Sequence, residues 1–276
     1  MIVVFSDMDG CLLDHHTYEW EAALPAIETL KRMGAPLVLT TSKTRAEVEY
    51  WQKLIGLREP SIVENGGALL LPPEAFPQLP PEAVLPPGGK LAVWQLGWPH
   101  AEIVRALHRA AAESQCEVRG FSDMTVEEVA THCNMPVEQA ALASQRQYSE
   151  PFLILTPRRE PALLQAFLAH GLKMTRGGRF FHAQRHPGKG DAVGRLLEWL
   201  ASVQIPVTSI GLGDGLNDEG FLRVVDYPII LESAHAAELH RLIPHAERTP
   251  QPGPAAWASA LLSVLKRIRE NADPAA

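Results

Sequence analysis

Short apolar runs alternate with helical patterns over the first 71 residues, and this alternation limits the chain to few folds. A helix is expected to begin after Thr44, because Thr44 and Glu47 have the spacing of a capping box. The expected strands are Ile2 to Phe5, Pro36 to Thr40, Ser61 to Val63 and Ala68 to Leu71. Strands that alternate with helices are typical of a parallel sheet. We therefore predict an α/β fold, with a Rossmann-like parallel-sheet core and helices on both faces.

The alternation stops in residues 71–90, which contain seven prolines. Proline removes a backbone donor and restricts φ, so this stretch is expected to be a stiff, irregular connector. Mixed strand and helix patterns follow, beginning with an expected strand at Leu91 to Gln95, and the α/β pattern resumes near residue 187. The chain is therefore predicted to have a core of residues 1–82 and 187–276, interrupted by an α+β domain of residues 83–186.

Charge, apolar runs and cysteine spacing argue against several classes of protein. A formal net charge of -7 and a pI near 5.9 do not favour a nucleic-acid-binding protein. We found neither an apolar run of the roughly 20 residues that a membrane span needs nor a secretory signal pattern. The three cysteines, Cys11, Cys116 and Cys133, form no metal-binding pair and no disulfide pattern. A cytoplasmic protein is expected. A small anionic substrate stays compatible with the net charge, because a metal or a local basic cluster can reverse the potential of one pocket.

Two acidic clusters follow predicted strands that are about 200 residues apart. Asp7 and Asp9 follow the first strand, and Asp214 and Asp218 lie in a glycine-rich loop after the strand that begins at Thr208. A calcium-binding EF-hand is excluded, because Cys11 stands where position 5 needs an oxygen ligand. Ligands of open α/β sheets bind at the carboxyl ends of the strands. The four carboxylates therefore predict an oxygen-rich site suited to Mg²⁺.

Two further segments favour a phosphate ligand. Thr41 and Ser42 lie between the second strand and the next helix, where hydroxyls and backbone amides can bind an anion. Lys189 lies between two glycines before another predicted helix. An isolated lysine is usually a solvated surface group, but the acidic clusters make it a candidate for balancing carboxylate and phosphate charge.

The segments DMDG, TTSK, GKGD and GDGLND occur in this order, and together they resemble the four motifs of the haloacid dehalogenase superfamily of phosphatases. The position of the insert resembles the subgroup with a large α+β cap of the C2 type. Within it, DMDGCLLD, TTSKT, ENGGALLLP, SQRQYSEPF and TRGGRFFH are similar to segments of the mannosyl-3-phosphoglycerate phosphatases. Cys11 departs from the pattern, since the superfamily usually has threonine there.

The resemblance implies a Mg²⁺-dependent phosphatase that forms an aspartyl-phosphate. Asp7 would be the nucleophile, and Asp9 would protonate the leaving oxygen and later activate water. Thr41, Ser42 and Lys189 would hold the phosphoryl group. The metal ligands would be the side chains of Asp7 and Asp214 and the carbonyl of Asp9, with Asp218 binding directly or through water.

The same resemblance implies that the insert recognises the substrate, a phosphorylated sugar acid. Arginines can grip a carboxylate, and flexible glycine backbone can approach an anion. The candidates for the acid are Arg146, Arg176 and Arg179 with Gly177 and Gly178, and those for the sugar are Gln145, Tyr148 and His182. Asn65 is expected at the mouth of the pocket.

Several alternatives stay open at this point. Other substrates of the same class are glucosyl-3-phosphoglycerate and sucrose phosphate, and a phosphomutase would use the same groups. A signalling receiver also carries an aspartyl-phosphate, but an Asp9 placed to activate water argues against a long-lived phosphoryl group. A catalytically inactive sugar-binding relative would not need all four motifs. The sequence does not determine the oligomeric state.

Overall fold

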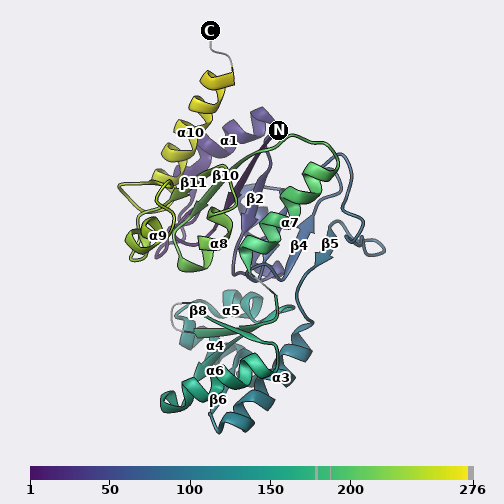
Figure 1. Ribbon diagram of the computed structural model, residues 1–276, viewed down its shortest axis with the longest axis vertical. Helices are drawn as coiled ribbons and strands as arrows, with labels where there is room; N and C mark the ends of the chain where they lie inside the picture. Colours follow the sequence, from purple (N-terminus) through teal and green to yellow (C-terminus); the bar gives the residue numbers. More distant parts are fainter. Residues whose placement is uncertain (178–179, 187, 273–276) are drawn as a thin grey trace.

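Two β-sheets organise the described part of the protein (Figure 1). The computed structural model describes residues 1–177, 180–186 and 188–272. The larger sheet has eight strands in the order β12-β11-β10-β1-β2-β3-β4-β5, and the smaller has four in the order β6-β7-β9-β8. The large sheet is built from both ends of the chain, which agrees with a core interrupted by an insert.

The six strands from β12 to β3 are parallel, and β4 and β5 are antiparallel additions at one edge. β1 lies between β10 and β2, so the two ends of the chain meet at the centre of the sheet. The strands are β1 (Ile2–Ser6), β2 (Leu37–Thr40), β3 (Ser61–Val63), β4 (Ala68–Leu71), β5 (Ala92–Gln95), β10 (Thr208–Gly213), β11 (Tyr227–Ile230) and β12 (Glu247–Arg248).

Helices cover both faces of the large sheet, as predicted. Side chains alternate along a strand, so Val4 packs into the apolar cluster on one face while Val3 and Phe5 pack into the cluster on the other. The first face is covered by α1 (Leu24–Met33), α2 (Arg45–Ile55) and α10 (Gly253–Ala272). The second is covered by α7 (Lys189–Ser202), α8 (Glu219–Leu222) and α9 (Ala236–Leu242).

Local signals place most of these elements within a few residues. The predicted capping box at Thr44 and Glu47 is present at the start of α2. After β10, a 3-10 turn at Leu216–Asp218 precedes the four-residue α8. Other 3-10 turns lie at Glu21–Ala23, Phe121–Asp123 and Pro157–Arg159.

The small sheet forms an α+β layer, as predicted, which is drawn below the large sheet in Figure 1. Its strands pair antiparallel, and helices lie on both faces. One face packs through Phe152 and Phe181, and the other through Leu153 and Phe180. The strands are β6 (Val118–Gly120), β7 (Ser149–Ile154), β8 (Lys173–Gly177) and β9 (Phe180–Gln184). The helices are α3 (His100–Ser114) and α6 (Glu160–Ala169) on the first face, and α4 (Val126–Cys133) and α5 (Val137–Ala143) on the second.

The expectation that Leu91 to Gln95 belongs to the insert is wrong. β5 pairs with β4 in the large sheet, from Ala68 opposite Gln95 to Leu71 opposite Ala92. Phe76, in the proline-rich segment, and Trp94 both pack into the core cluster. The prolines prevent regular structure between β4 and β5 but do not carry the chain out of the core. We therefore propose that the insert begins after Gln95 rather than at residue 83.

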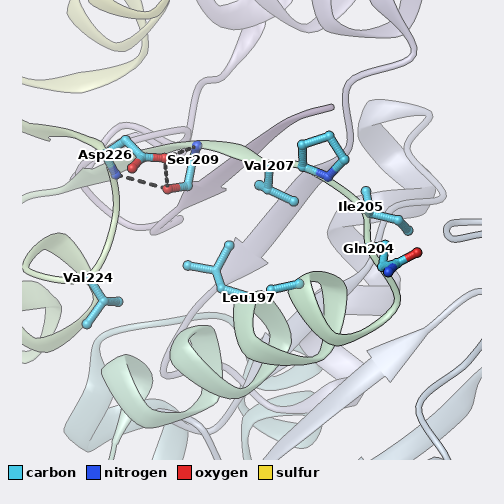
Figure 2. A pocket seen from close by; sticks show the side chains of 9 residues that line it. Leu197, Gln204, Ile205, Val207, Ser209, Val224 and Asp226 are labelled. Atoms are coloured by element: carbon cyan, nitrogen blue, oxygen red, sulfur yellow. Dashed lines mark hydrogen bonds between the residues drawn. The ribbon is translucent and has the colours of Figure 1, made fainter.

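A hollow of about 480 Å³ lies beside the amino end of β10 (Figure 2). The carboxylate of Asp226 accepts hydrogen bonds from the backbone N–H and the hydroxyl of Ser209 at 2.8 and 2.7 Å. These polar groups satisfy each other, and the hollow lies at the opposite end of β10 from Asp214. It is therefore not the candidate site. None of the described helices combines the length and apolar character that a membrane span requires.

Candidate active site

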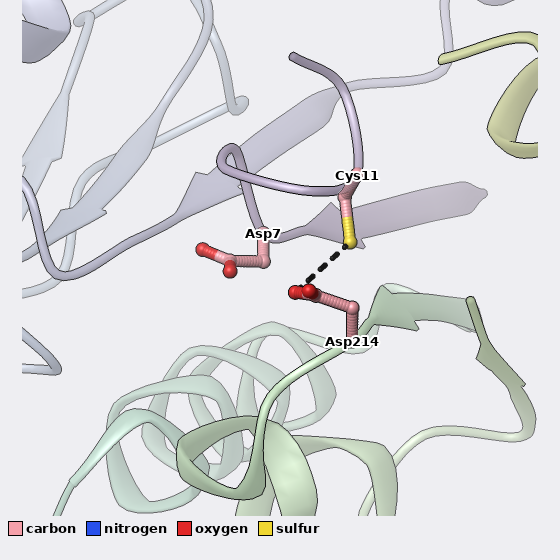
Figure 3. Close-up of side chains that lie close together, drawn as sticks. All are labelled: Asp7, Cys11 and Asp214. Carbon is pink, nitrogen blue, oxygen red and sulfur yellow. Dashed lines mark hydrogen bonds between the residues drawn. The ribbon is translucent and has the colours of Figure 1, made fainter. Parts of the chain in front are cut away.

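Asp7 and Asp214 lie together at the carboxyl edge of the large sheet. Asp7 directly follows β1 and Asp214 directly follows β10, and these two strands are neighbours. The backbone N–H of Asp7 donates to the carbonyl of Leu212 at 2.9 Å, which extends the pairing of the two strands. Ligand atoms of Asp7, Cys11 and Asp214 all lie within 4.8 Å of one another (Figure 3). The topology thus joins two acidic segments that are distant in sequence.

Gly10 allows this close approach. Its φ is +75°, a left-handed conformation that costs glycine little. A Cβ atom at this position would lie 2.4 Å from Oδ2 of Asp214. The glycine is therefore required both by the turn after β1 and by the carboxylate that faces it.

Lys189 connects the acidic groups through a fully buried ammonium. Its Nζ lies 2.9 Å from Oδ1 of Asp7 and 2.7 Å from Oδ1 of Asp218. The other oxygen of Asp218, Oδ2, accepts hydrogen bonds from the backbone N–H groups of Asp214 and Gly215 at 3.0 and 2.9 Å. Both oxygens of Asp218 are thus bonded within the protein, which favours a role in positioning Lys189. Direct metal ligation by Asp218 stays a prediction.

The electrostatics of this cluster fit a divalent cation. Burial raises the pKa of Asp7 to about 7, although Lys189 opposes this rise. Burial and the neighbouring Asp7 raise the pKa of Asp214 to about 8. When Asp7, Asp214 and Asp218 are all ionised, the single charge of Lys189 leaves two negative charges unbalanced. The carboxylate oxygens of the buried Asp7 and the half-buried Asp214 therefore form a site suited to a divalent metal ion.

Cys11 does not contribute a thiolate to this site. Burial and the charge of Asp214 hold the pKa of its thiol well above the ordinary value. Its Sγ lies 3.8 Å from Oδ1 of Asp214, which suits a weak S–H donor. The neutral thiol is therefore a weak hydrogen-bond donor to Asp214, a contact that the hydroxyl of a threonine could also make.

Asp9 has its own lysine partner, which the sequence analysis did not identify as a site residue. The Nζ of Lys43 lies 2.9 Å from Oδ1 of Asp9, and Glu47 lies 3.8 Å from the same ammonium. Burial alone would lower the pKa of Lys43, but these two carboxylates raise it above its ordinary value. Lys43 belongs to the TTSK segment, directly after the phosphate-binding candidates Thr41 and Ser42. Its place in this motif was the sequence signal that could have identified it as a site residue.

Thr41 and Ser42 lie in the loop between β2 and α2, at the same edge of the sheet as Asp7. Thr41 is fully buried, and its hydroxyl accepts a hydrogen bond from the backbone N–H of Lys43 at 3.1 Å. The loop is therefore well ordered by its own contacts. Phosphate binding by Thr41 and Ser42 stays a prediction.

Comparisons with known proteins identify the family. A model of haloacid dehalogenase-like hydrolases matches residues 4–74. The glucosyl-3-phosphoglycerate/mannosyl-3-phosphoglycerate phosphatase of Persephonella marina is 34% identical, over 98% of this chain and 99% of its own. The chain belongs to the haloacid dehalogenase-like hydrolase family.

A second relative agrees with the family assignment, and a solved structure agrees with the fold. The mannosyl-3-phosphoglycerate phosphatase of Pyrococcus furiosus is 35% identical, over 83% of this chain and 90% of its own. A haloacid dehalogenase-like hydrolase from B. subtilis superposes with a TM-score of 0.65 at 16% identity, over 96% of this chain and all of that one (100%). The structural likeness supports the fold alone.

The guanidinium of Arg146 pairs with other residues of the hydrolase. Its Nε lies 3.3 Å from Oε2 of Glu64, and its Nη2 donates to the hydroxyl of Ser149 at 2.6 Å and to the carbonyl of Ser42 at 3.1 Å. Glu64 also accepts hydrogen bonds from the backbone N–H groups of Gln147 and Tyr148. Arg146 therefore joins the insert to the core, and its assignment to the substrate carboxylate stays a prediction.

The remaining candidates are distributed around this junction. Oδ1 of Asn65 accepts a hydrogen bond from Asn217 at 3.1 Å, which places Asn65 beside the GDGLND loop. Tyr148 is buried against Gly67, whereas the side-chain amide of Gln145 donates to the carbonyl of Ala141 in the preceding helix. Of these, only Asn65 has a described contact with the acidic loops.

His182 lies in β9, and burial together with Arg146 lowers its pKa to about 3, so its imidazole is neutral. Arg176 and Gly177 belong to β8, but the side chain of Arg176 is outside the described part of the structure. Gly178 and Arg179 lie outside the described residues altogether. Their proposed contacts with the acid therefore stay predictions.

Proposed function

We propose that this hydrolase is a Mg²⁺-dependent phosphatase that converts mannosyl-3-phosphoglycerate to mannosylglycerate and phosphate through an aspartyl-phosphate. The observation that carries the proposal is the meeting of Asp7 and Asp214 on neighbouring strands, with Lys189 between Asp7 and Asp218. The substrate is supported by the names of the relatives from Persephonella marina and Pyrococcus furiosus.

Asp7 and Asp9 have separate roles in the proposed reaction, as nucleophile and as general acid and base. A carboxylate oxygen of Asp7 attacks phosphorus, and the bond from phosphorus to the glycerate oxygen breaks as Asp9 donates a proton to that oxygen. Asp9 then removes a proton from the water that attacks the aspartyl-phosphate, which releases phosphate and restores Asp7. Lys189, Thr41 and Ser42 hold the phosphoryl oxygens during both steps.

The side chains of Asp7 and Asp214 and the carbonyl of Asp9 would hold Mg²⁺, with Asp218 bound directly or through water. The ion would keep Asp7 ionised near neutral pH and offset the negative charge of the phosphoryl group. The raised pKa values of Asp7 and Asp214 support this assignment, because burial and the neighbouring carboxylates disfavour their ionised forms and Lys189 offsets this only in part.

A screen of phosphorylated substrates tests the proposed activity. We expect phosphate release from mannosyl-3-phosphoglycerate with Mg²⁺ and at least a hundredfold less with excess EDTA, because Asp7 and Asp214 would then repel the substrate. Asp7→Asn should release no phosphate although its circular dichroism spectrum is unchanged. Substantial turnover by Asp7→Asn would overturn the assignment of the nucleophile, and turnover of only unrelated phosphate esters would overturn the substrate.

Glucosyl-3-phosphoglycerate is a second candidate substrate. The relatives from Persephonella marina and Methanococcoides burtonii are both named for the glucosyl and the mannosyl compound. The same screen distinguishes the two by their kcat/KM values. A cytoplasmic location is also proposed, and it is supported by the lack of a disulfide among the three cysteines, all of which lie in the described residues.

A further inference from the structure

A small pocket lies where the insert meets the core, next to the proposed proton donor. Its volume is about 200 Å³. The core supplies Tyr18, Lys43, Glu47 and Trp51, and the insert supplies Met135, Pro136 and Gln139. The pocket therefore exists only where the two parts of the hydrolase are in contact.

One wall of the pocket is aromatic. The rings of Tyr18 and Trp51 are stacked, with centroids 5.8 Å apart and planes inclined by 20°. The ammonium of Lys43 lies 5.3 Å from the centroid of the Tyr18 ring. Tyr18 remains 37% exposed, although the chain around it is held in place. A rigid aromatic surface that stays open to solvent is typical of a binding site rather than of a packed core.

The loop that carries Tyr18 is built to present it. The carboxylate of Asp14 accepts hydrogen bonds from the backbone N–H groups of His16 and Thr17, both at 2.9 Å. Tyr18 itself has a φ of 59°, an uncommon conformation for a residue with a large side chain. Its position is therefore specified by the loop and is not a result of random surface exposure.

Lys43 connects this pocket directly to the reaction. It lines the pocket, and its Nζ lies 2.9 Å from Oδ1 of Asp9. In the proposed mechanism Asp9 protonates the oxygen of the departing glycerate. The group attached to that glycerate must therefore lie within a few ångströms of Asp9, which is where the pocket lies.

We propose that this pocket binds the sugar ring of the leaving group, an inference that rests on the proposed phosphatase function. A pyranose ring has an apolar C–H face that can pack on Tyr18, and hydroxyls that can bond to Glu47 and Gln139. Pockets for drug-sized ligands measure roughly 300–1,000 Å³, so the smaller volume here suits a single ring. Specificity for a glycosylated acid would thus depend on both the core and the insert.

Two variants test the pocket, one on the core side and one on the insert side. Tyr18→Leu keeps apolar volume but removes the aromatic surface, and Gln139→Ala removes one amide from α5 with a residue that favours helix. We expect the ratio of kcat/KM for mannosyl-3-phosphoglycerate to kcat/KM for p-nitrophenyl phosphate to fall at least tenfold for Tyr18→Leu and about threefold for Gln139→Ala. The ratio isolates the sugar, because p-nitrophenyl phosphate has none.

Matched controls come from residues of the same type that do not line the pocket. Tyr50→Leu changes an exposed tyrosine on α2, and Gln165→Ala changes an exposed glutamine on α6. Both controls should keep the ratio within twofold of the original protein. Mannosylglycerate should also inhibit hydrolysis of p-nitrophenyl phosphate at least tenfold less strongly in Tyr18→Leu than in Tyr50→Leu.

The outcomes separate this inference from the proposed function. An unchanged ratio in both pocket variants, with mannosyl-3-phosphoglycerate still hydrolysed, would overturn the sugar site and leave the phosphatase assignment intact. An original protein that hydrolyses p-nitrophenyl phosphate but no glycosylated phosphoglycerate would overturn the proposed substrate, and the sugar site with it. If Tyr18→Leu fails to fold, the ratio measured for Gln139→Ala decides alone.

Discussion

Individual residues determine whether the acidic groups can coexist. A buried carboxylate is stable only when cations or hydrogen bonds balance its charge. Lys189 supplies one cation to Asp7 and Asp218, and backbone N–H groups satisfy the rest of Asp218. Gly10 supplies space instead of charge, since a side chain there would displace the carboxylate of Asp214.

Gly10→Ala is expected to reduce phosphatase kcat/KM by at least a hundredfold. The added methyl group would meet Oδ2 of Asp214 at 2.4 Å and force one metal ligand out of place. Gly34→Ala is the matched control, because Gly34 also has a left-handed φ, of +60°, but no atom lies within 4 Å of its added Cβ. Similar thermal stability with activity lost only in Gly10→Ala would support the clash, whereas equal activity in the two variants would contradict it.

At the scale of elements, one buried ionic cluster joins the loop after β3 to the chain before β7. Glu64 accepts from Gln147 and Tyr148, binds the hydroxyl of Ser149 at 2.7 Å, and pairs with Arg146. Glu64 and its neighbour Asn65 both have left-handed backbone conformations, with φ of 50° and 59°. The turn therefore directs the carboxylate toward the insert.

Glu64→Ala is expected to lower the free energy of unfolding by about 3–5 kcal/mol, because Arg146 would remain buried without its carboxylate. Urea denaturation measures this change. Glu232→Ala is the control, since Glu232 forms a solvent-exposed ion pair with Arg248 whose loss should cost less than about 1 kcal/mol. A double-mutant cycle with Arg146→Met should show strong coupling, and additive effects would show that the two side chains act independently.

At the scale of the whole molecule, global stability should depend on buried histidines. His186 is 5% exposed and lies where the chain returns from the insert to the core. Burial and the positive charge of Lys173 lower its pKa to about 4, from 6.5 as the ordinary value. The unfolded chain therefore takes up a proton as the pH falls below 6.5, while the folded protein does not until about pH 4.

This difference predicts that His186 makes the protein less stable as the pH falls from 7 to 5, by roughly 2 kcal/mol for this one group. Urea denaturation at the two pH values should show a weaker pH dependence for His186→Gln than for the original protein. His245→Gln, at an exposed position, should keep the original dependence. An equal pH dependence in all three proteins would contradict the role of His186.

Much of the fold and the acidic site could be predicted because the signals are local. Side-chain periodicity identified β1, β2 and their helices, and the capping box identified the start of α2. The order of DMDG, TTSK, GKGD and GDGLND also indicated that residues near the two ends of the chain would share one site. The meeting of Asp7 and Asp214 follows from this topology, since adjacent parallel strands end at the same edge.

Other features depend on partners that no local pattern specifies. The apolar pattern of β5 predicts a strand, but only pairing with β4 places it in the large sheet. Arg146 is an arginine in a polar segment until the fold brings it to Glu64, 82 positions earlier in the chain. By itself, then, the sequence determined the elements and the chemical types of the site residues. The tertiary structure decided which charges neutralise one another and which surfaces enclose a ligand, because burial and proximity arise only when distant segments pack together.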